Sequence, residues 1–325
     1  MDERIRQAGE MLARNFETLG LPVEFVDGVS HTLGDTLYFN LKDISQFNVN
    51  WIKQLVLKQA VATHLDMQFE LTKTSHFKVE VKYPKSNILP LASILDTHSI
   101  NIGRDTDNEL VSIDFNNNTP HLLIAGTTGS GKSVLLKTLF CSIYNTYYNT
   151  NRSRFNGAIF YVIDPKGTEF NEFRNKCRYI DTTFGAIQTL HEIEELMDYR
   201  YKNNDMKGAD VFVFIDELAD LMLTSRFEVE EIIVRIAQKG RACGIHLIVA
   251  TQRPSVDVVS GLIKANLPTR LILRTASMRD SIVCIDHKGA EALVGNGDCI
   301  FKNGYIEKHF KVAYPDQNII NSIVR

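Results

Sequence analysis

The chain has 325 residues, of which 44% are hydrophobic and 23% charged, with a formal net charge of −3. This length predicts about two domains, and the composition excludes a disordered or fibrous protein. The slightly negative charge means that any nucleic-acid contact would need a local group of basic side chains, and the five scattered cysteines argue against a disulfide framework or a zinc site.

The first third of the chain predicts a small α+β unit. Apolar residues recur at helical spacing before Gly20, and alternate as in strands after Pro22. No apolar run approaches the ~18–20 residues that span a bilayer, and the N-terminus has no apolar signal region. We therefore expect a cytoplasmic chain without a membrane segment. The predicted elements are helices over residues 2–19 and 50–65 and strands over residues 23–29, 36–43, 67–73 and 76–83.

After Pro120 the pattern changes to buried strands that alternate with helical segments, following two strands over residues 100–105 and 110–115. Continuous apolar runs of this kind are typical of a mostly parallel sheet covered on both faces, which is an α/β fold. We expect the boundary near Asn108, with domains over residues 1–108 and 109–325. The buried strands are predicted over residues 121–126, 158–164, 211–216, 246–252 and 270–275. His121 and His246 lie inside two of them and are expected to be packed, structural residues.

A phosphate-binding loop follows the first of these strands. Residues 126–133 match G-x-x-x-x-G-K-[ST], and they lie between the strand HLLIA and a helix. Glycines allow backbone N–H groups to surround a polyphosphate, and the helix N-terminus favours anions. Lys132 is expected to reach the β- and γ-phosphates of ATP, and the Ser133 hydroxyl to bind Mg²⁺. The predicted nucleotide-binding residues are Gly126, Thr127, Thr128, Gly129, Ser130, Gly131, Lys132, Ser133 and Val134.

Two further strands end in side chains suited to hydrolysis. The run VFVFI delivers Asp216 and Glu217 to the carboxyl edge of the sheet, where ligands of open α/β sheets bind. Asp216 is expected to hold Mg²⁺, and Glu217 to act as general base toward water. Gln252, at the end of the strand HLIVAT, is expected to contact the γ-phosphate or the attacking water.

A basic interval occupies residues 235–279, where Asp257 is the only acid. One interpretation is an arginine that acts on the ATP of a neighbouring subunit. Another is a phosphate backbone bound without base readout, and a third is a solvated surface. For Arg270 and Arg274, on an apolar strand, we expect structural ion pairs. The basic residues of the interval are Arg235, Lys239, Arg241, Arg253, Lys264, Arg270, Arg274 and Arg279.

The segments IDELADLM, GRACGIHLIVATQRPSVDVVSGLIKANLPTR and GAEALVGNGDCIF resemble the motor region of the FtsK/SpoIIIE family of DNA translocases. The resemblance runs from about Pro120 to Phe301, and the segment before it resembles the approach of the family to the phosphate-binding loop. The first hundred residues resemble the α subdomain of the family much more loosely.

The resemblance implies a RecA-like P-loop NTPase core that forms a homohexameric ring around double-stranded DNA, with ATP sites between subunits. By position, Arg241 is then the arginine that acts in trans, and Gln252 is the sensor. Arg253 and Lys264 are expected to face DNA in the channel. Asp164 and Lys166, in IDPKGTEF, are expected to support the site.

Two departures from the family follow from the same comparison. The membrane-bound members carry transmembrane helices before the motor and a winged-helix module after it, and this sequence has neither. Anchoring and directed loading are then expected to be absent or supplied by other chains, unless the sequence is an excised part of a longer one. Minimal proteins of this kind are expected on plasmids, integrative elements or phages.

Three functions remain open at this point. The first is a ring motor that moves double-stranded DNA. The second is a coupling ATPase that delivers DNA to a conjugation machine and recognises partner proteins of conjugation or segregation. The third is a protein-export ATPase of the type VII kind, which shares the fold but usually carries several motor domains on one chain.

Overall fold

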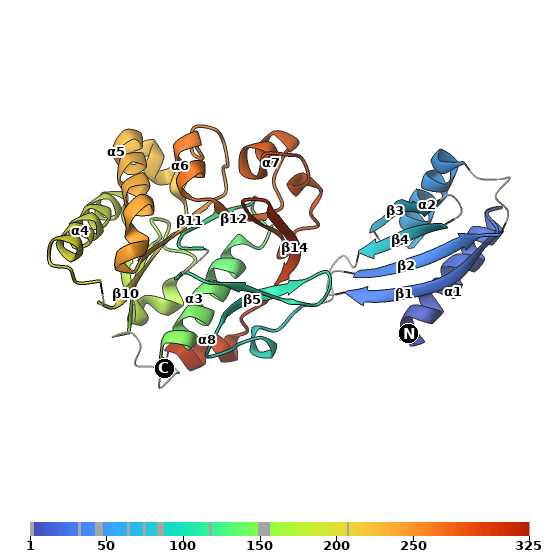
Figure 1. Ribbon diagram of the computed structural model, residues 1–325, viewed down its shortest axis with the longest axis horizontal. Helices are drawn as coiled ribbons and strands as arrows, with labels where there is room; N and C mark the ends of the chain where they lie inside the picture. The colour runs from blue at the N-terminus through green and yellow to red at the C-terminus, as the bar shows by residue number, and fades with distance from the viewer. Residues whose placement is uncertain are drawn as a thin grey trace. The chain divides into compact units, whose positions relative to one another are not determined.

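The computed structural model divides the chain into two compact units, which are described separately (Figure 1). The smaller unit contains residues Met1–Ile88 and Asp105–Glu109, and the larger contains Leu89–Arg104 and Leu110–Arg325. The described residues are 3–31, 34–42, 48–63, 66–73, 76–82, 88–116, 119–148, 157–206 and 208–324.

The smaller unit is an antiparallel sheet with two helices, as the sequence predicts. Its strands lie in the order β1-β2-β4-β3. The apolar stripe of the first helix packs on the sheet through Phe16, whose ring lies edge-on to Phe39 at a centroid distance of 5.7 Å. Phe39 in turn stacks on Phe77 at 5.4 Å. The elements are α1 Glu3–Thr18, β1 Val23–His31, β2 Gly34–Leu41, α2 Val49–Thr63, β3 Asp66–Lys73 and β4 His76–Lys82.

The larger unit is built on one ten-stranded sheet, in the order β6-β5-β14-β13-β12-β7-β11-β10-β8-β9. Its strands are β5 Ile100–Asp105, β6 Leu110–Ile113, β7 Leu122–Ala125, β8 Ala158–Ile163, β9 Arg178–Ile180, β10 Asp210–Ile215, β11 Ile245–Thr251, β12 Thr269–Leu273, β13 Asp298–Asn303 and β14 Ile306–Val312. Its α-helices are α3 Lys132–Tyr148, α4 Thr183–Lys202, α5 Leu218–Lys239, α6 Gly261–Asn266, α7 Met278–Ile285 and α8 Gln317–Val324. Short 3₁₀ helices occupy Leu91–Ser93, Asn171–Lys176, Gly240–Cys243 and Ala290–Ala292.

The centre of this sheet is parallel, which confirms the expected fold class. Strands β12, β7, β11, β10, β8 and β9 all run in one direction, whereas β13 and β14 add an antiparallel hairpin beside β12. Because the central strands are parallel, their carboxyl ends meet at one edge of the sheet. The loops after β7, β10 and β11 therefore lie next to one another.

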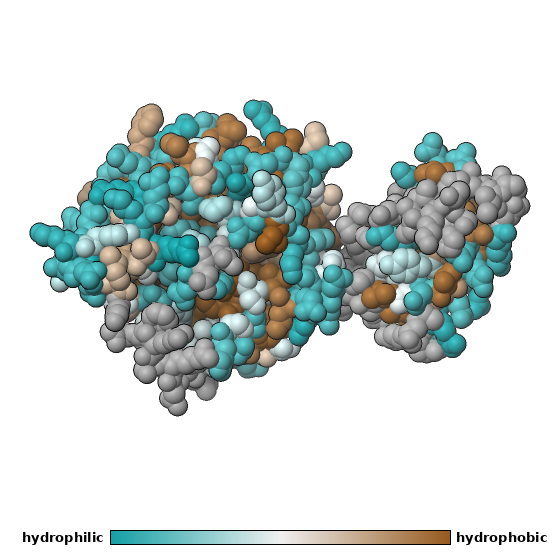
Figure 2. All heavy atoms as spheres, viewed as in Figure 1, coloured by the Kyte–Doolittle hydropathy of each residue, from teal (hydrophilic) through white to brown (hydrophobic). Residues whose placement is uncertain are grey.

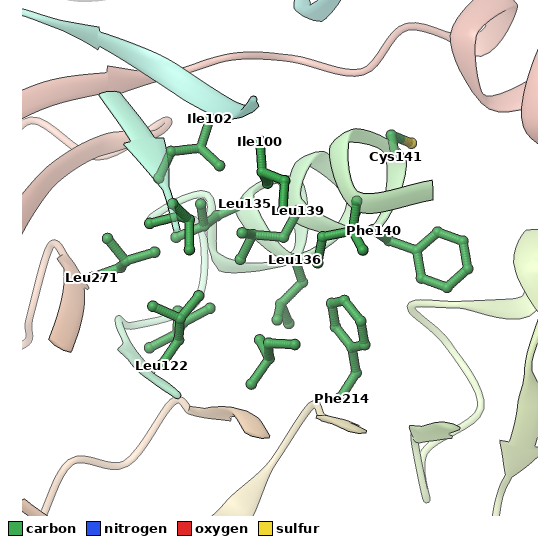
Figure 3. Packing of buried hydrophobic residues seen from close by; sticks show 14 of the residues in the cluster. Ile100, Ile102, Leu122, Leu135, Leu136, Leu139, Phe140, Cys141, Phe214 and Leu271 are labelled. Carbon is green, nitrogen blue, oxygen red and sulfur yellow. The ribbon is translucent and has the colours of Figure 1, made fainter. Parts of the chain in front are cut away.

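Helices cover both faces of the sheet, which explains the uninterrupted apolar runs. Every residue of β7, β10 and β11 is buried. On one face Leu135, Leu139 and Phe140 of α3 pack against strand side chains such as Phe214 (Figure 3). Helix α8 packs on the same face, and α4 and α5 pack on the other (Figure 1).

The division between the units differs from the boundary expected near Asn108. Residues Leu89–Arg104 group with the larger unit because β5 lies inside the large sheet, beside β14. The Ala313 N–H donates to the Ile102 carbonyl at 2.9 Å, and the Leu91 N–H donates to the Tyr314 carbonyl at 2.8 Å. That residues 1–108 and 109–325 are two domains stays a prediction.

The two histidines of the strand pattern are structural, as expected. The Leu247 N–H donates to Nδ1 of His121 at 3.0 Å, and His246 stacks on Phe212. Burial lowers the pKa of His121 to about 3 and that of His246 to about 4. Within the part of the chain that the structure describes, none of the helices has the length and apolar character needed to cross a bilayer.

Candidate functional site

The phosphate-binding loop joins β7 to α3 at the carboxyl edge of the sheet. Gly129 and Gly131 have φ values of 77° and 104°, a left-handed backbone that favours glycine. The loop is tied to its neighbours, because the Gly126 N–H donates to the Thr251 carbonyl at 3.2 Å and the Thr127 N–H to the Arg274 carbonyl at 2.9 Å. The loop therefore lies between the ends of β11 and β12, where the N-terminus of α3 begins.

A segment far along the chain braces this loop. The Gly297 N–H, at the start of β13, donates to the Ser130 carbonyl at 2.8 Å. A side chain on Gly131 would place its Cβ 2.5 Å from the Gly297 nitrogen, so glycine is required there for packing as well as for φ. The sequence motif GAEALVGNGDCIF thus includes a structural support for the phosphate-binding loop, which the pattern alone did not reveal.

Lys132 and Asp216 form a buried ion pair at the same edge. The Lys132 ammonium lies 2.5 Å from Oδ1 of Asp216 and 2.8 Å from its backbone carbonyl. The two side chains are only 3% and 2% exposed. Burial raises the pKa of the Asp216 carboxyl above its usual range, although the Lys132 ammonium opposes this shift. The pair brings the first residue of α3 to the carboxyl end of β10.

Glu217 lies beside the tip of β11. Its Oε1 accepts a hydrogen bond from the Thr251 hydroxyl at 2.7 Å, and its Oε2 accepts one from the Gln252 N–H at 3.0 Å. The Gln252 side chain is turned toward the phosphate-binding loop, where its Oε1 accepts from the Thr128 hydroxyl at 3.0 Å. The structure therefore brings together the four side chains that the sequence assigned to phosphate, metal, base and sensor.

Thr251 was not singled out from the sequence. The signal was available in its position, because it is the last residue of a buried strand and directly precedes Gln252. A threonine there reads as an ordinary β-branched strand residue. Only the contact with Glu217 shows that its hydroxyl belongs to the site.

Asp164 and Lys166 support the site in different ways. The buried Asp164 carboxylate accepts from the N–H groups of Gly167 and Glu169, each at 3.0 Å, and from the Tyr179 hydroxyl at 2.7 Å. It therefore fixes the loop after β8. Lys166 extends from this loop and pairs with Asp220, in the first turn of α5, at 3.1 Å.

The cations predicted to act outside this site have different surroundings. Arg241 lies in the 3₁₀ helix before β11, at the opposite edge of the sheet from Glu217, and it is exposed. Arg253 directly follows Gln252 and is also exposed. Lys264, by contrast, pairs with Asp286 at 3.0 Å. The structure therefore leaves Arg241 and Arg253 accessible and places Lys264 in an ion pair.

Several cations of the basic interval are neutralised by acids outside it. Arg235 pairs with Glu194 and Asp198 of α4 at 2.9 and 2.7 Å. Arg270 pairs with Asp286 at 2.8 Å, which confirms the structural ion pair expected for it. No ion pair of Arg274 occurs within the described ranges, where its guanidinium donates to the Val294 carbonyl at 3.4 Å. The net positive charge around this interval is therefore smaller in the folded protein than the sequence alone indicates.

The FtsK/SpoIIIE family model matches residues 95–211 and 202–256, which include the phosphate-binding loop, the strand of Asp216 and Glu217, and the strand before Gln252. This chain belongs to the FtsK/SpoIIIE family. Membership and the geometry of the loop make it a P-loop ATPase that binds nucleotide. The resemblance seen in the sequence is thereby confirmed.

Two members of the family show how far the similarity extends. DNA translocase FtsK of Leptospira interrogans is 40% identical over 232 residues, which cover 63% of this chain and 24% of that protein. DNA translocase SftA of Bacillus subtilis is 33% identical over 339 aligned residues, which cover 93% of this chain and 34% of that protein. The chain thus spans about a quarter to a third of the length of these relatives.

A solved structure extends the likeness of fold over both units. The pCW3 conjugation coupling protein TcpA, solved as a monomer with ATPγS, matches with a TM-score of 0.67 at 22% identity. The match covers 98% of this chain and 99% of that one. The likeness of fold therefore includes the small α+β part as well as the larger ATPase part.

Proposed function

We propose that this protein is an ATP-driven motor that moves double-stranded DNA. The observation that carries the proposal is that Lys132, Asp216, Glu217 and Gln252 lie together at one edge of the sheet. The chain also belongs to a family whose members include proteins named DNA translocases. A carboxylate beside the metal-binding carboxylate suits transfer of the γ-phosphoryl group to water. We place the protein in the cytoplasm, where ATP and DNA are both present.

The proposed roles follow from position. Lys132 neutralises the β- and γ-phosphates, and the backbone of Thr128, Gly129 and Gly131 donates its N–H groups to them. Glu217 removes a proton from the attacking water. Gln252 bridges the phosphate-binding loop to the end of β11, so it is placed to report the state of the γ-phosphate.

The residues present fit Mg²⁺. The Ser133 hydroxyl and the Asp216 carboxylate supply hard oxygen ligands, and Mg²⁺ in phosphate sites usually takes one or two carboxylates and completes its shell with phosphates and water. When bound, Mg²⁺ would neutralise the charge that develops on the phosphates. Asp216, which pairs with Lys132 in this structure, would hold the ion together with Ser133.

We propose a homohexameric ring as the working form. Arg241 lies at the edge of the sheet opposite to Glu217, so it is suited to the ATP of a neighbouring subunit rather than to its own. Apolar side chains on α5 and α6 support an interface between subunits, since Leu223, Phe227 and Leu262 are 77%, 86% and 60% exposed. Figure 2 shows apolar surface over this part of the larger unit.

Duplex DNA should stimulate ATP hydrolysis by this protein. We expect a several-fold increase in turnover and ATP-dependent displacement of a third strand from a triplex substrate. A variant with Glu217→Gln should show neither effect. Turnover that does not respond to duplex DNA, together with an intact triplex, would show that the proposal of DNA translocation is wrong.

Arg253→Ala should weaken DNA binding at least several-fold, whereas Lys264→Ala should change it by less than about twofold. Arg253 is exposed and Lys264 is held by Asp286, so only Arg253 is available to displace counterions from phosphates. The slope of log K against log salt should fall by about one for each cation–phosphate interaction that a substitution removes. Fluorescence anisotropy with a labelled duplex between ~50 and ~200 mM salt measures both quantities.

An equal effect of the two substitutions would contradict this ranking. It would show that the Lys264–Asp286 pair opens on DNA, as the sequence-based assignment of Lys264 requires. A salt-insensitive complex would exclude phosphate contacts by either residue.

The other two functions stay predictions. The likeness to TcpA is a likeness of fold, and it does not distinguish a coupling ATPase from a translocase. A coupling ATPase would retain DNA-stimulated hydrolysis and also bind a relaxase or a channel protein in a pull-down. A protein-export ATPase would hydrolyse ATP in response to a protein substrate and not to DNA.

A further inference from the structure

Both oxygens of the Glu217 carboxylate are engaged by hydrogen-bond donors. The side chain is 2% exposed. Oε1 accepts from the Thr251 hydroxyl at 2.7 Å and from the Ala219 N–H at 3.3 Å. The Gln252 N–H lies 3.0 Å from Oε2 and 3.2 Å from Oε1. A carboxylate held in this way has few lone pairs left to accept a proton from water.

The Thr251 hydroxyl makes a second contact besides the one with Glu217. It accepts a hydrogen bond from the Arg253 N–H at 3.1 Å. Arg253 begins the segment of residues 253–260, which contains the exposed cation proposed to meet DNA. One hydroxyl therefore lies between the general base and the first residue of the proposed DNA-contacting segment.

The same segment is tied to α5 beyond an interruption in that helix. Ser225 has φ −152° and ψ 74°, which breaks α5 after its first two turns. Past the break, Arg226 pairs with Asp257 at 3.1 Å, and Ser260 donates to the Glu230 carboxylate. A shift of residues 253–260 would thus move the part of α5 beyond the break, which is separated from Glu217. Through the Arg253 N–H it would also move the Thr251 hydroxyl at the end of β11.

We propose that Thr251 is a positioning residue that restrains Glu217, and that movement of residues 253–260 on DNA releases it. The restraint keeps the base away from the attacking water until the segment moves. This inference rests on the proposed function, because it takes Glu217 as the base and residues 253–260 as the DNA-contacting segment. It assigns to Thr251 the coupling between DNA and hydrolysis.

The test compares Thr251→Val with a matched control, Thr269→Val. Both threonines are fully buried on strands of the large sheet, but the Thr269 hydroxyl has no hydrogen-bond partner among the described residues. ATP turnover is measured with and without duplex DNA, together with KM for ATP and the melting temperature. Thr251→Ser, which keeps the hydroxyl, serves as the rescue variant.

We expect Thr251→Val to raise turnover without DNA by about fivefold, the factor that corresponds to removing one ordinary hydrogen bond. The ratio of DNA-stimulated to basal turnover should fall by a similar factor, and KM should change by less than about twofold. Thr251→Ser should restore most of the wild-type ratio, and Thr269→Val should match the wild type. If the valine variant melts at a much lower temperature, Thr251→Ala repeats the test without the added methyl group.

An unchanged or lower basal turnover in Thr251→Val would overturn the proposal. Equal decreases of basal and stimulated turnover would do the same, because they would show a structural role only. If duplex DNA fails to stimulate the wild type, the proposed function fails, whereas the basal rates of the valine and serine variants still decide whether Thr251 restrains Glu217.

Discussion

ATP hydrolysis should fall by about two to four orders of magnitude when Glu217 is replaced by glutamine, the contribution typical of a general base. Glutamine keeps the shape and the ability of its oxygen to accept from Thr251 but does not take a proton from water. ATP binding should persist, because Lys132 and the glycine-rich loop are unchanged. Single-turnover hydrolysis and equilibrium binding of a fluorescent ATP analogue separate the two effects.

Glu228→Gln is the matched control for this prediction. Glu228 lies on α5, the helix that begins directly after Glu217, and pairs with His191 at 2.9 Å. Its substitution should leave turnover within about twofold of the wild type. Normal turnover in Glu217→Gln would mean that another group activates the water.

Arg241→Ala should lower turnover by about three to five orders of magnitude, the range measured for arginines that stabilise the transition state of phosphoryl transfer. Lys132→Ala should be similarly inactive. A mixture of the two variants should regain part of the activity, because an intact site forms wherever an Arg241→Ala subunit receives Arg241 from a Lys132→Ala neighbour. Steady-state turnover across mixing ratios measures this recovery.

Lys239→Ala provides the control, since it removes an exposed cation two residues from Arg241 on the same edge of the sheet. It should retain nearly full turnover, and its mixture with Lys132→Ala should only dilute the activity. Two inactive parents whose mixture stays inactive would rule out Arg241 as a residue that acts in trans.

The sequence predicted the frame of the site because local patterns determine it. The strands that carry Lys132, Asp216 and Gln252 to one edge are fully buried apolar runs, and such runs identify parallel strands without tertiary information. The turn glycines of the phosphate-binding loop are equally local, since their backbone angles require them. The small unit was predicted for the same reason, from amphipathic helices and alternating strands.

Local sequence patterns could not predict the interactions between segments that are far apart in the chain. Part of the charge of the basic interval is balanced by Glu194, Asp198 and Asp286, which lie outside it in sequence. The role of Thr251 depends on the neighbouring strand that carries Glu217. The compact units divide differently from the boundary expected near residue 108, because β5 pairs with β14 in the large sheet and no local pattern predicts that pairing.

The close approach of Gly131 and Gly297 has a consequence for how the phosphate-binding loop can be engineered. The two glycines lie in motifs far apart in the chain, yet neither backbone could approach the other if Gly131 carried a side chain. The Gly297 carbonyl in turn accepts from the Val312 N–H of β14 at 2.8 Å. The loop and the β13–β14 hairpin are therefore packed as one unit. A chimaera that exchanges the loop without its hairpin would contain every residue of the nucleotide motif. Its loop would nevertheless lack the packing against Gly297 that supports it here.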